Sequence, residues 1–280
     1  MRTEISGLSE SEGIMQKALI LCKAGFDGKN VEGAGVYTAA ALSRLGVSTA
    51  AAAKIDGDFS DDIREFFRKN GVDESLITEE NRLDFAVSPD DFDAVFITGE
   101  FVLDNENSYS LAQKICEECR KLEIPVVFDP GNFGEKENVE KIKDIALRAE
   151  VFVPAVEDAK LLCGLTEPEK IADYFISLGV NKIVITLGKQ GAFFKSRVES
   201  GEAPTFRADK VVDVTGAGDA FAAGLISGVI EKIPLGEAVV RANACGCCAI
   251  QSEGFRFPAM QELREYMLTH RFVVDGCKDY

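Results

Sequence analysis

The residues most suited to chemistry form the run Asp213-Val214-Thr215-Gly216-Ala217-Gly218-Asp219, and apolar residues at helical spacing follow it directly. The β-branched stretch 210–214 predicts a strand, so the two glycines lie at a strand-to-helix turn. The first amides of a helix lack internal partners and carry about half a positive charge, and glycine lets a ligand approach the backbone closely. This turn is therefore a candidate phosphate-binding site.

Asp219 ends the run, at the mouth of this turn. Bound phosphate would repel a carboxylate there unless the carboxylate had a task, such as removing the proton of an attacking hydroxyl group. Phosphoryl transfer to a hydroxyl is thus the first hypothesis. A plain tight connection before a helix is the alternative, because many glycine-rich turns bind no ligand.

The rest of the chain alternates predicted strands with predicted helices. We predict strands at 17–22, 47–53, 94–98, 125–128, 151–153 and 182–186, and helices at 36–45, 59–69, 107–122, 139–148, 156–162, 168–178 and 234–250. This repetition predicts an α/β fold in which helices cover both faces of a mostly parallel central sheet. Ligand sites of such folds gather at the carboxyl ends of the strands. We interpret residues 1–280 as one domain.

The charge and the apolar segments exclude several classes of function. The chain has 47 acidic and 31 basic residues and a formal net charge of −16, which argues against nucleic acid as a partner. Its apolar stretches are too short or too interrupted to span a membrane. Residues 1–12 carry three glutamates and do not resemble a secretory signal, so we expect a cytoplasmic protein.

The eight cysteines include two C-x-x-C pairs, Cys116 with Cys119 and Cys245 with Cys248. Such thiols could bind zinc. However, both pairs lie on predicted helices without a histidine nearby, so we favour reduced thiols that pack as small apolar side chains. His270, the only histidine, lies in a polar C-terminal tail, and we predict a surface position for it.

The run 213–219, D-V-T-G-A-G-D with an apolar helix after it, resembles the second signature of the PfkB, or ribokinase-like, carbohydrate kinases. The stretch 32–46 resembles the first signature in part, with Glu32 in place of a glycine and Tyr37 in place of a common sugar-contacting asparagine. Thr186-Leu187-Gly188-Lys189-Gln190-Gly191 resembles the T-L-G-x-x-G nucleotide loop of the family, although it also fits a plain hairpin. The resemblance covers about residues 17–266 and implies a ribokinase-like three-layer fold.

The resemblance also assigns roles to residues of this chain. It implies that Asp219 is the general base and that the backbone amides of Gly216, Ala217 and Gly218 stabilise the transferred phosphoryl group. It places ATP at Thr186, Gly188, Gly191, Gly218 and Asn243. The phosphate acceptor would contact Gly33, Asp129 and Asp219, although Asp129-Pro130 could equally be a simple turn.

Two metal sites follow from the same resemblance. Residues 154–164 resemble a family segment whose N-x-x-E element arranges Mg²⁺, here with Ala155 in place of the asparagine and Asp158 in place of the glutamate. Asp158, or Glu157 beside it, could act on Mg²⁺ through water; both acids could instead simply begin a helix. The backbone carbonyls of Asp213 and Thr215 are candidates for a monovalent cation such as K⁺.

The resemblance is weakest where the family carries a lid over the sugar. Only residues 78–92 are available for lid strands, so we expect a largely absent lid with one remaining strand at 82–87. Closure would then come from a partner subunit, as in a homodimer, or from residues 1–16.

The first hypothesis is therefore ATP-dependent phosphorylation of a hydroxyl group on a small sugar or sugar acid. The alternatives are a nucleoside or vitamin-precursor kinase of the same fold, and a nucleotide-binding protein without turnover. A scaffold protein, which would need neither ATP nor Asp219, is a third class.

Overall fold

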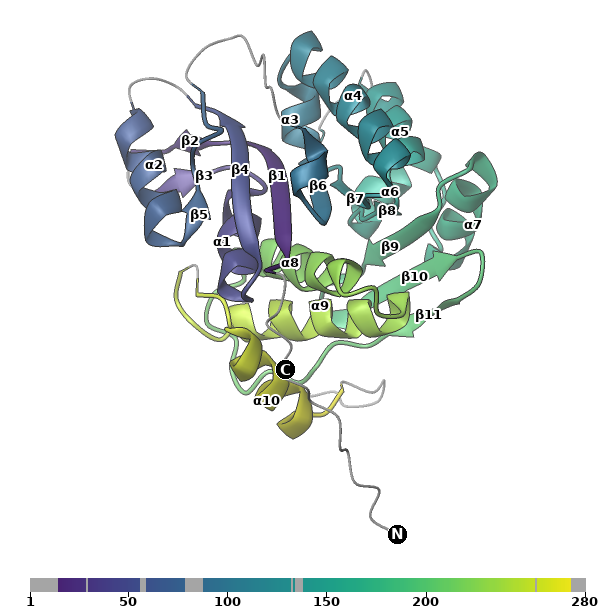
Figure 1. Cartoon of the computed structure of the whole chain (residues 1–280). Coiled ribbons are helices and arrows are strands. Elements are labelled where there is room, and N and C mark those ends of the chain that lie inside the picture. The colour runs from purple at the N-terminus through teal and green to yellow at the C-terminus, as the bar shows by residue number, and fades with distance from the viewer. Residues whose placement is uncertain are drawn as a thin grey trace.

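The computed structural model describes residues 15–28, 30–55, 59–78, 88–131, 133, 138–254 and 256–272. Within these ranges one sheet of nine strands forms the centre, in the order β11-β10-β9-β8-β7-β6-β1-β4-β5 (Figure 1). The strands that pair in parallel are β1 (Lys17–Lys23), β4 (Ser48–Lys54), β5 (Val72–Asp73), β6 (Ala94–Thr98), β7 (Val126–Asp129), β8 (Val151–Phe152) and β9 (Lys182–Thr186).

Two antiparallel strands extend this sheet at one edge, β10 (Ala192–Ser196) and β11 (Ser200–Ala203). A short 3₁₀ turn, Gly188–Gln190, connects β9 to β10. Apart from the main sheet, β2 (Gly25–Phe26) pairs with β3 (Val31–Glu32).

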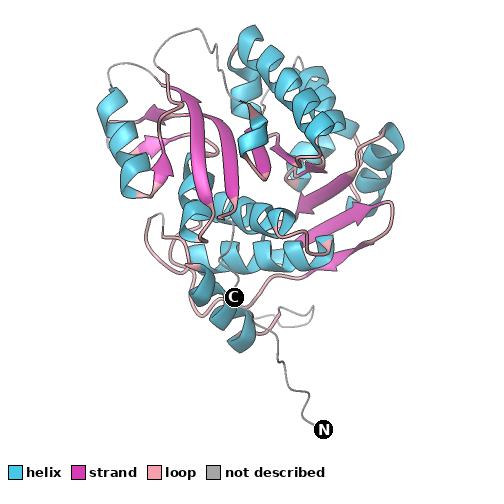
Figure 2. Cartoon of the chain, in the orientation of Figure 1, coloured by secondary structure: helices cyan, strands magenta, loops and turns pink. Residues whose placement is uncertain are grey.

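Helices cover both faces of the sheet, as the cyan ribbons on either side of the magenta strands show (Figure 2). One face carries α1 (Val36–Arg44), α2 (Ser60–Lys69), α8 (Ala217–Ile230), α9 (Leu235–Ala249) and α10 (Met260–Thr269). The other carries α3 (Gly99–Asp104), α4 (Glu106–Leu122), α5 (Val139–Arg148), α6 (Val156–Cys163) and α7 (Pro168–Leu178). The predicted three-layer α/β fold is confirmed.

The central strand β1 explains why the two cores form. Residues 18–22 are all almost fully buried, and successive side chains enter opposite cores: Ile20 packs under the α1 and α8 side, whereas Leu19 and Leu21 pack under the α3 and α4 side. A parallel strand covered on both faces has this continuous apolar character. The apolar run that predicts the strand therefore also fixes the layers.

Most predicted elements are confirmed, and β6, α5, α7 and β9 have the predicted bounds. The predicted strand at 210–214 is wrong. Val211 and Val214 are 55% and 67% exposed, and the backbone N–H groups of Val212 and Asp213 donate to the carbonyl of Ile250 at the end of α9, 2.8 and 3.3 Å away. This stretch packs on a helix end and joins no sheet. The predicted lid strand at 82–87 lies outside the described residues.

Both cysteine pairs lie on helices, as predicted, with Cys116 and Cys119 on α4 and Cys245 and Cys248 on α9. Burial raises the pKa of the Cys116 thiol to about 12, so it stays protonated and packs as an apolar group. Of the helices in the described ranges, none has both the length and the apolar character that crossing a bilayer requires.

Candidate active site

The start of α8 forms the centre of the candidate site. Gly216 precedes the helix with φ 77°, a left-handed conformation that side chains disfavour, and it turns the chain directly into the first helical turn. The N–H of Ala217 closes this turn on the carbonyl of Val214 at 3.3 Å. A Cβ built on Gly218 would meet no atom within 4 Å, so the glycine leaves open space beside the helix N-terminus.

The Asp219 carboxylate is held by α1 and the residue before it. Thr38 Oγ1 donates to Asp219 Oδ1 at 2.9 Å, and the backbone N–H groups of Gly35 and Thr38 donate to the same carboxylate. Burial raises the pKa of Asp219 above its ordinary value, although these three bonds oppose the shift. The structure therefore gives Asp219 a fixed orientation and a higher basicity than that of an exposed aspartate.

Further carboxyl groups lie near Asp219 at the carboxyl ends of the strands. Asp129 ends β7 and Glu100 follows β6. Burial raises the pKa of Asp129 to about 7, and the charges of Asp219, Asp158 and Glu100 add to the shift, whereas a 2.9 Å bond from the N–H of Gly131 opposes it. The structure thus brings the predicted substrate-side Asp129 to the same sheet edge as Asp219.

A cavity of about 520 Å³ contains the predicted acceptor residue Gly33. A Cβ on Gly33 would lie 2.1 Å from the carbonyl oxygen of Lys23, so the chain has no room for a side chain there. The N–H of Ala34 donates to Glu100 Oε2 at 2.9 Å and ties this loop to the end of β6. Half of the residues that line the cavity are charged: its lining is Lys23, Gly25, Glu32, Gly33, Glu100, Leu103, Asp104 and Phe133.

Tyr37 does not belong to the lining of this cavity. Its hydroxyl donates to the carbonyl of Val31, and its ring packs edge-on against Phe66 at 5.5 Å between centroids. It therefore braces the hairpin of β2 and β3, which explains why a large residue fits where the resemblance expects an asparagine.

A second cavity, of about 680 Å³, lies between the end of β9, the hairpin after it, α8 and α9. All five residues predicted to contact ATP line it: Thr186, Gly188, Gly191, Gly218 and Asn243. Its other walls are mostly apolar and include Phe206, Val211, Val214, Phe221 and Ile250. Asn243 also has a structural task, because its Nδ2 donates to the carbonyls of Ala203 and Pro204 at 2.8 and 3.4 Å and holds the end of β11.

The predicted Mg²⁺ residues differ in their surroundings. Glu157 is exposed and pairs with Lys160 at 3.0 Å. Asp158 is half-buried; burial and the charge of Glu157 raise its pKa to about 6, and its own charge acts on Asp129. A divalent cation would relieve this repulsion, and carboxylates acting directly or through water suit Mg²⁺. Asp158 with Asp129 therefore fits a magnesium site better than Glu157 does. Over the described residues, no group of three or more His, Cys, Asp or Glu side chains gathers as a complete metal site.

The Asp213 side chain stabilises the turn before α8. Its Oδ1 accepts from the N–H of Thr215 at 2.9 Å, and bonds from Thr215 and the N–H of Gly254 lower its pKa. The loop 252–254 therefore lies beside the run 213–219, as a shared monovalent-cation site would require.

His270 lies at the surface only in part. It follows the last residue of α10, and the side chain of His270 is 22% exposed. The ring stacks on Tyr266 at 3.8 Å, and Nε2 lies 3.4 Å from Asp209 Oδ2. His270 lines neither the acceptor cavity nor the nucleotide cavity.

The sequence reasoning missed two residues of the site, Thr38 and Glu100. Thr38 is a buried helix residue with no signal of its own, because its partner Asp219 is 181 positions away. Glu100 lies two residues beyond a predicted strand, so the rule that sites gather at strand ends could have found it.

Comparison with known proteins agrees with this arrangement. The family model described as pfkB family carbohydrate kinase matches residues 78–262. The chain belongs to this family.

Among curated relatives, the 2-dehydro-3-deoxygluconokinase of Bacillus subtilis is 38% identical over 144 residues, which cover 51% of this chain and 44% of that protein. The ATP-dependent 6-phosphofructokinase of Thermoanaerobacterium thermosaccharolyticum is 34% identical over 133 residues, 46% of this chain and 41% of that protein. The matched part thus spans less than half the length of either relative. The crystal structure of aminoimidazole riboside kinase from Salmonella enterica, complexed with aminoimidazole riboside and an ATP analogue, has a TM-score of 0.72 at 22% identity and covers 90% of this chain and 100% of that one. This likeness shows the fold.

Proposed function

We propose that this chain transfers the γ-phosphoryl group of ATP to a hydroxyl group of a small sugar or sugar-like molecule. One observation carries the proposal: the first turn of α8 supplies both Gly218, which lines the nucleotide cavity, and Asp219, which Gly35 and Thr38 hold by hydrogen bonds. Gly33, which lines the acceptor cavity, lies two residues before Gly35. Its family membership supports the same chemistry.

In this proposal Asp219 takes the proton of the attacking hydroxyl group. Burial raises its pKa, which makes it a better base than an ordinary aspartate. The three hydrogen bonds fix the carboxylate in place, so little reorganisation accompanies the proton transfer.

The backbone amides of Gly216, Ala217 and Gly218 would stabilise the charge on the transferred group. Donors of this kind typically contribute roughly 10²–10³ each in rate. When bound at Asp158 and Asp129, Mg²⁺ would neutralise phosphate charge; the protein's own part is then largely positioning and electrostatics. We also propose that the carbonyls of Asp213 and Thr215 bind K⁺, since the loop 252–254 lies next to them.

The charges around the acceptor cavity narrow the class of acceptor. Three acidic residues line it, Glu32, Glu100 and Asp104, against one basic residue, Lys23. Lys23 already pairs with Asp104 at 2.9 Å. A surplus of carboxylates repels an anionic acceptor, so we favour a neutral sugar, polyol or nucleoside over a sugar acid.

A substrate panel with ATP-coupled detection tests the proposal. Neutral sugars, amino sugars, sugar acids and nucleosides would be compared at equal concentration with MgATP, beside thermal unfolding with and without ATP. We expect product from a neutral acceptor. Thermal protection by ATP without product from any acceptor would contradict the kinase function and favour a nucleotide-binding protein without turnover. No effect of ATP at all would leave only the scaffold class.

A further inference from the structure

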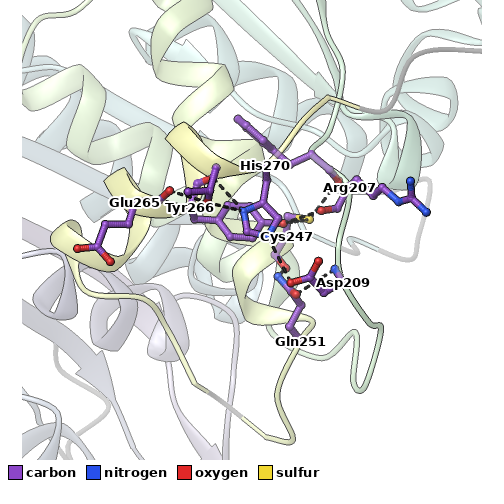
Figure 3. Close-up of polar contacts among 9 residues, drawn as sticks. Arg207, Asp209, Cys247, Gln251, Glu265, Tyr266 and His270 are labelled. Carbon is purple, nitrogen blue, oxygen red and sulfur yellow. Dashed lines mark hydrogen bonds and ion pairs between the residues drawn. The ribbon is translucent and has the colours of Figure 1, made fainter.

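The helix α10 lies against the loop that walls the nucleotide cavity (Figure 3). The N–H of Arg207 donates to the carbonyl of Arg271 at 2.9 Å, and Tyr266 Oη donates to the carbonyl of Arg207 at 3.0 Å. The ring of His270 stacks on Tyr266 and reaches Asp209, as described above. Residues 204–209 are thus held on one side by α10 and its C-terminal end.

Phe206 connects this contact to the cavity. It lines the nucleotide cavity, yet it is only 3% exposed because aromatic rings cover its other side. Its ring centroid lies 4.6 Å from that of Phe272 and 5.8 Å from that of Tyr266, and Phe206 forms an isolated β-bridge with Phe272. A shift of α10 would therefore move a wall of the cavity.

Cys247, on α9, contacts both Tyr266 and Phe206. Tyr266 Oη lies 3.1 Å from Cys247 Sγ, and the thiol donates to the carbonyl of Phe206 at 3.2 Å. Cys247 also lines the nucleotide cavity. The hydroxyl of Tyr266 consequently links the two segments that form this part of the wall, the loop 204–209 and α9, without lining the cavity itself.

We propose that α10 clamps the nucleotide cavity and that Tyr266 is a positioning residue for ATP. Residues 204–209 belong to no strand or helix apart from the bridge at Phe206. A loop that is not fixed in advance must be ordered when the ligand binds, and this ordering weakens binding. The clamp fixes the loop beforehand. This inference rests on the proposed ATP binding. It adds Tyr266 as a residue that supports ATP binding and lines neither cavity.

The substitution Tyr266→Phe tests the clamp because it removes the hydroxyl and keeps the ring between Phe206 and His270. The hydroxyl has one proton, which the carbonyl of Arg207 and Cys247 Sγ share as acceptors. One hydrogen bond contributes a modest net free energy, so we expect the dissociation constant for ATP, measured by calorimetry, to rise about three- to tenfold. In turnover assays the KM for ATP should rise by the same factor, with kcat and the KM for the acceptor unchanged.

Tyr109→Phe is the matched control. Its hydroxyl donates to Asp144 at 3.0 Å, on the face of the sheet opposite α10, and it lines neither cavity. It should lower stability by a similar amount and leave ATP binding unchanged. Hydrogen exchange gives a second readout: the backbone amides of residues 205–209 should exchange faster in Tyr266→Phe alone.

The outcomes are distinguishable. If the wild-type chain does not bind ATP, the proposed function fails before the clamp is tested. If the wild type binds ATP and Tyr266→Phe binds it equally well, the clamp is wrong, even if exchange at 205–209 rises. Should Tyr266→Phe not fold, His270→Gln removes the ring that stacks on Tyr266 together with its contact with Asp209, and unchanged ATP affinity in that variant would overturn the proposal equally.

Discussion

Replacing Thr38 with valine changes the proposed base without touching either cavity. Thr38 is 1% exposed, and its hydroxyl donates to Asp219 Oδ1 at 2.9 Å. Valine has nearly the same shape, so the substitution removes one hydrogen bond and little packing. The N–H groups of Gly35 and residue 38 still donate to the carboxylate, which keeps its orientation.

The expected effect is a shift in the titration of Asp219. A hydrogen bond to a charged group contributes roughly 1.5–3 kcal/mol, and one pKa unit corresponds to about 1.36 kcal/mol. Because the Thr38 bond lowers the pKa of Asp219, its loss should raise that pKa by about one to two units. The base works only when it is ionised. As the pH is lowered, activity should therefore begin to fall at a higher pH in the variant than in the wild type.

The measurement is kcat/KM as a function of pH for wild type and Thr38→Val with one acceptor. We expect the acidic limb of the profile to move up by about one to two pH units, with a much smaller effect on the alkaline plateau. Thr49→Val is the control, because Thr49 is equally buried and its hydroxyl donates to the carbonyl of Val47, away from Asp219. An acidic limb that does not move, or moves equally in both variants, would refute the role of Asp219 as the titrating base.

Three further outcomes follow from the same site. In Gly218→Ala the added Cβ enters open space, so we expect a melting temperature within about 2 °C of the wild type but a fall of at least about tenfold in kcat/KM, because the methyl group occupies the position proposed for phosphate. Asp129→Asn should raise the free energy of unfolding by about 1–4 kcal/mol at pH 8. The pKa of Asp129 is raised to about 7 in the folded state, so ionisation of this carboxyl lowers the stability of the wild type as pH rises from about 4 to 7. Urea unfolding should therefore show that the stability gained by Asp129→Asn disappears near pH 4. Asp158→Asn should raise the Mg²⁺ concentration needed for half-maximal activity by about tenfold, whereas Glu157→Gln, at an exposed position, should change it less than twofold.

The sheet and most helices could be predicted from the sequence because apolar periodicity reports burial. The strand β1 shows this well, since residues 18–22 are apolar and all become buried. The failure at 210–214 has the opposite cause: β-branched residues favour strands, but Val211 and Val214 are exposed and the stretch bonds to the end of α9. Strand propensity alone does not determine which groups the backbone N–H groups bond to.

In the candidate site, too, some residues could be predicted from the sequence and others could not. The turn 213–219 and the glycines near Thr186 carry local signals, and the structure places Gly188 and Gly218 on one cavity. Thr38 and Tyr266 carry none, because their roles depend on Asp219, Arg207 and other residues far away in the sequence. Long-range pairs of this kind arise only when the chain folds. The expected lid strand at 82–87 and a homodimer stay predictions.

The most direct test of the central claim is the substitution Asp219→Asn. Asparagine keeps the shape and can still accept from Thr38, but it cannot take a proton. We expect the dissociation constant for ATP to stay within about tenfold of the wild type while transfer to any acceptor that the wild type uses becomes undetectable, because the base acts only in the chemical step. Turnover retained at a level close to that of the wild type would contradict the account.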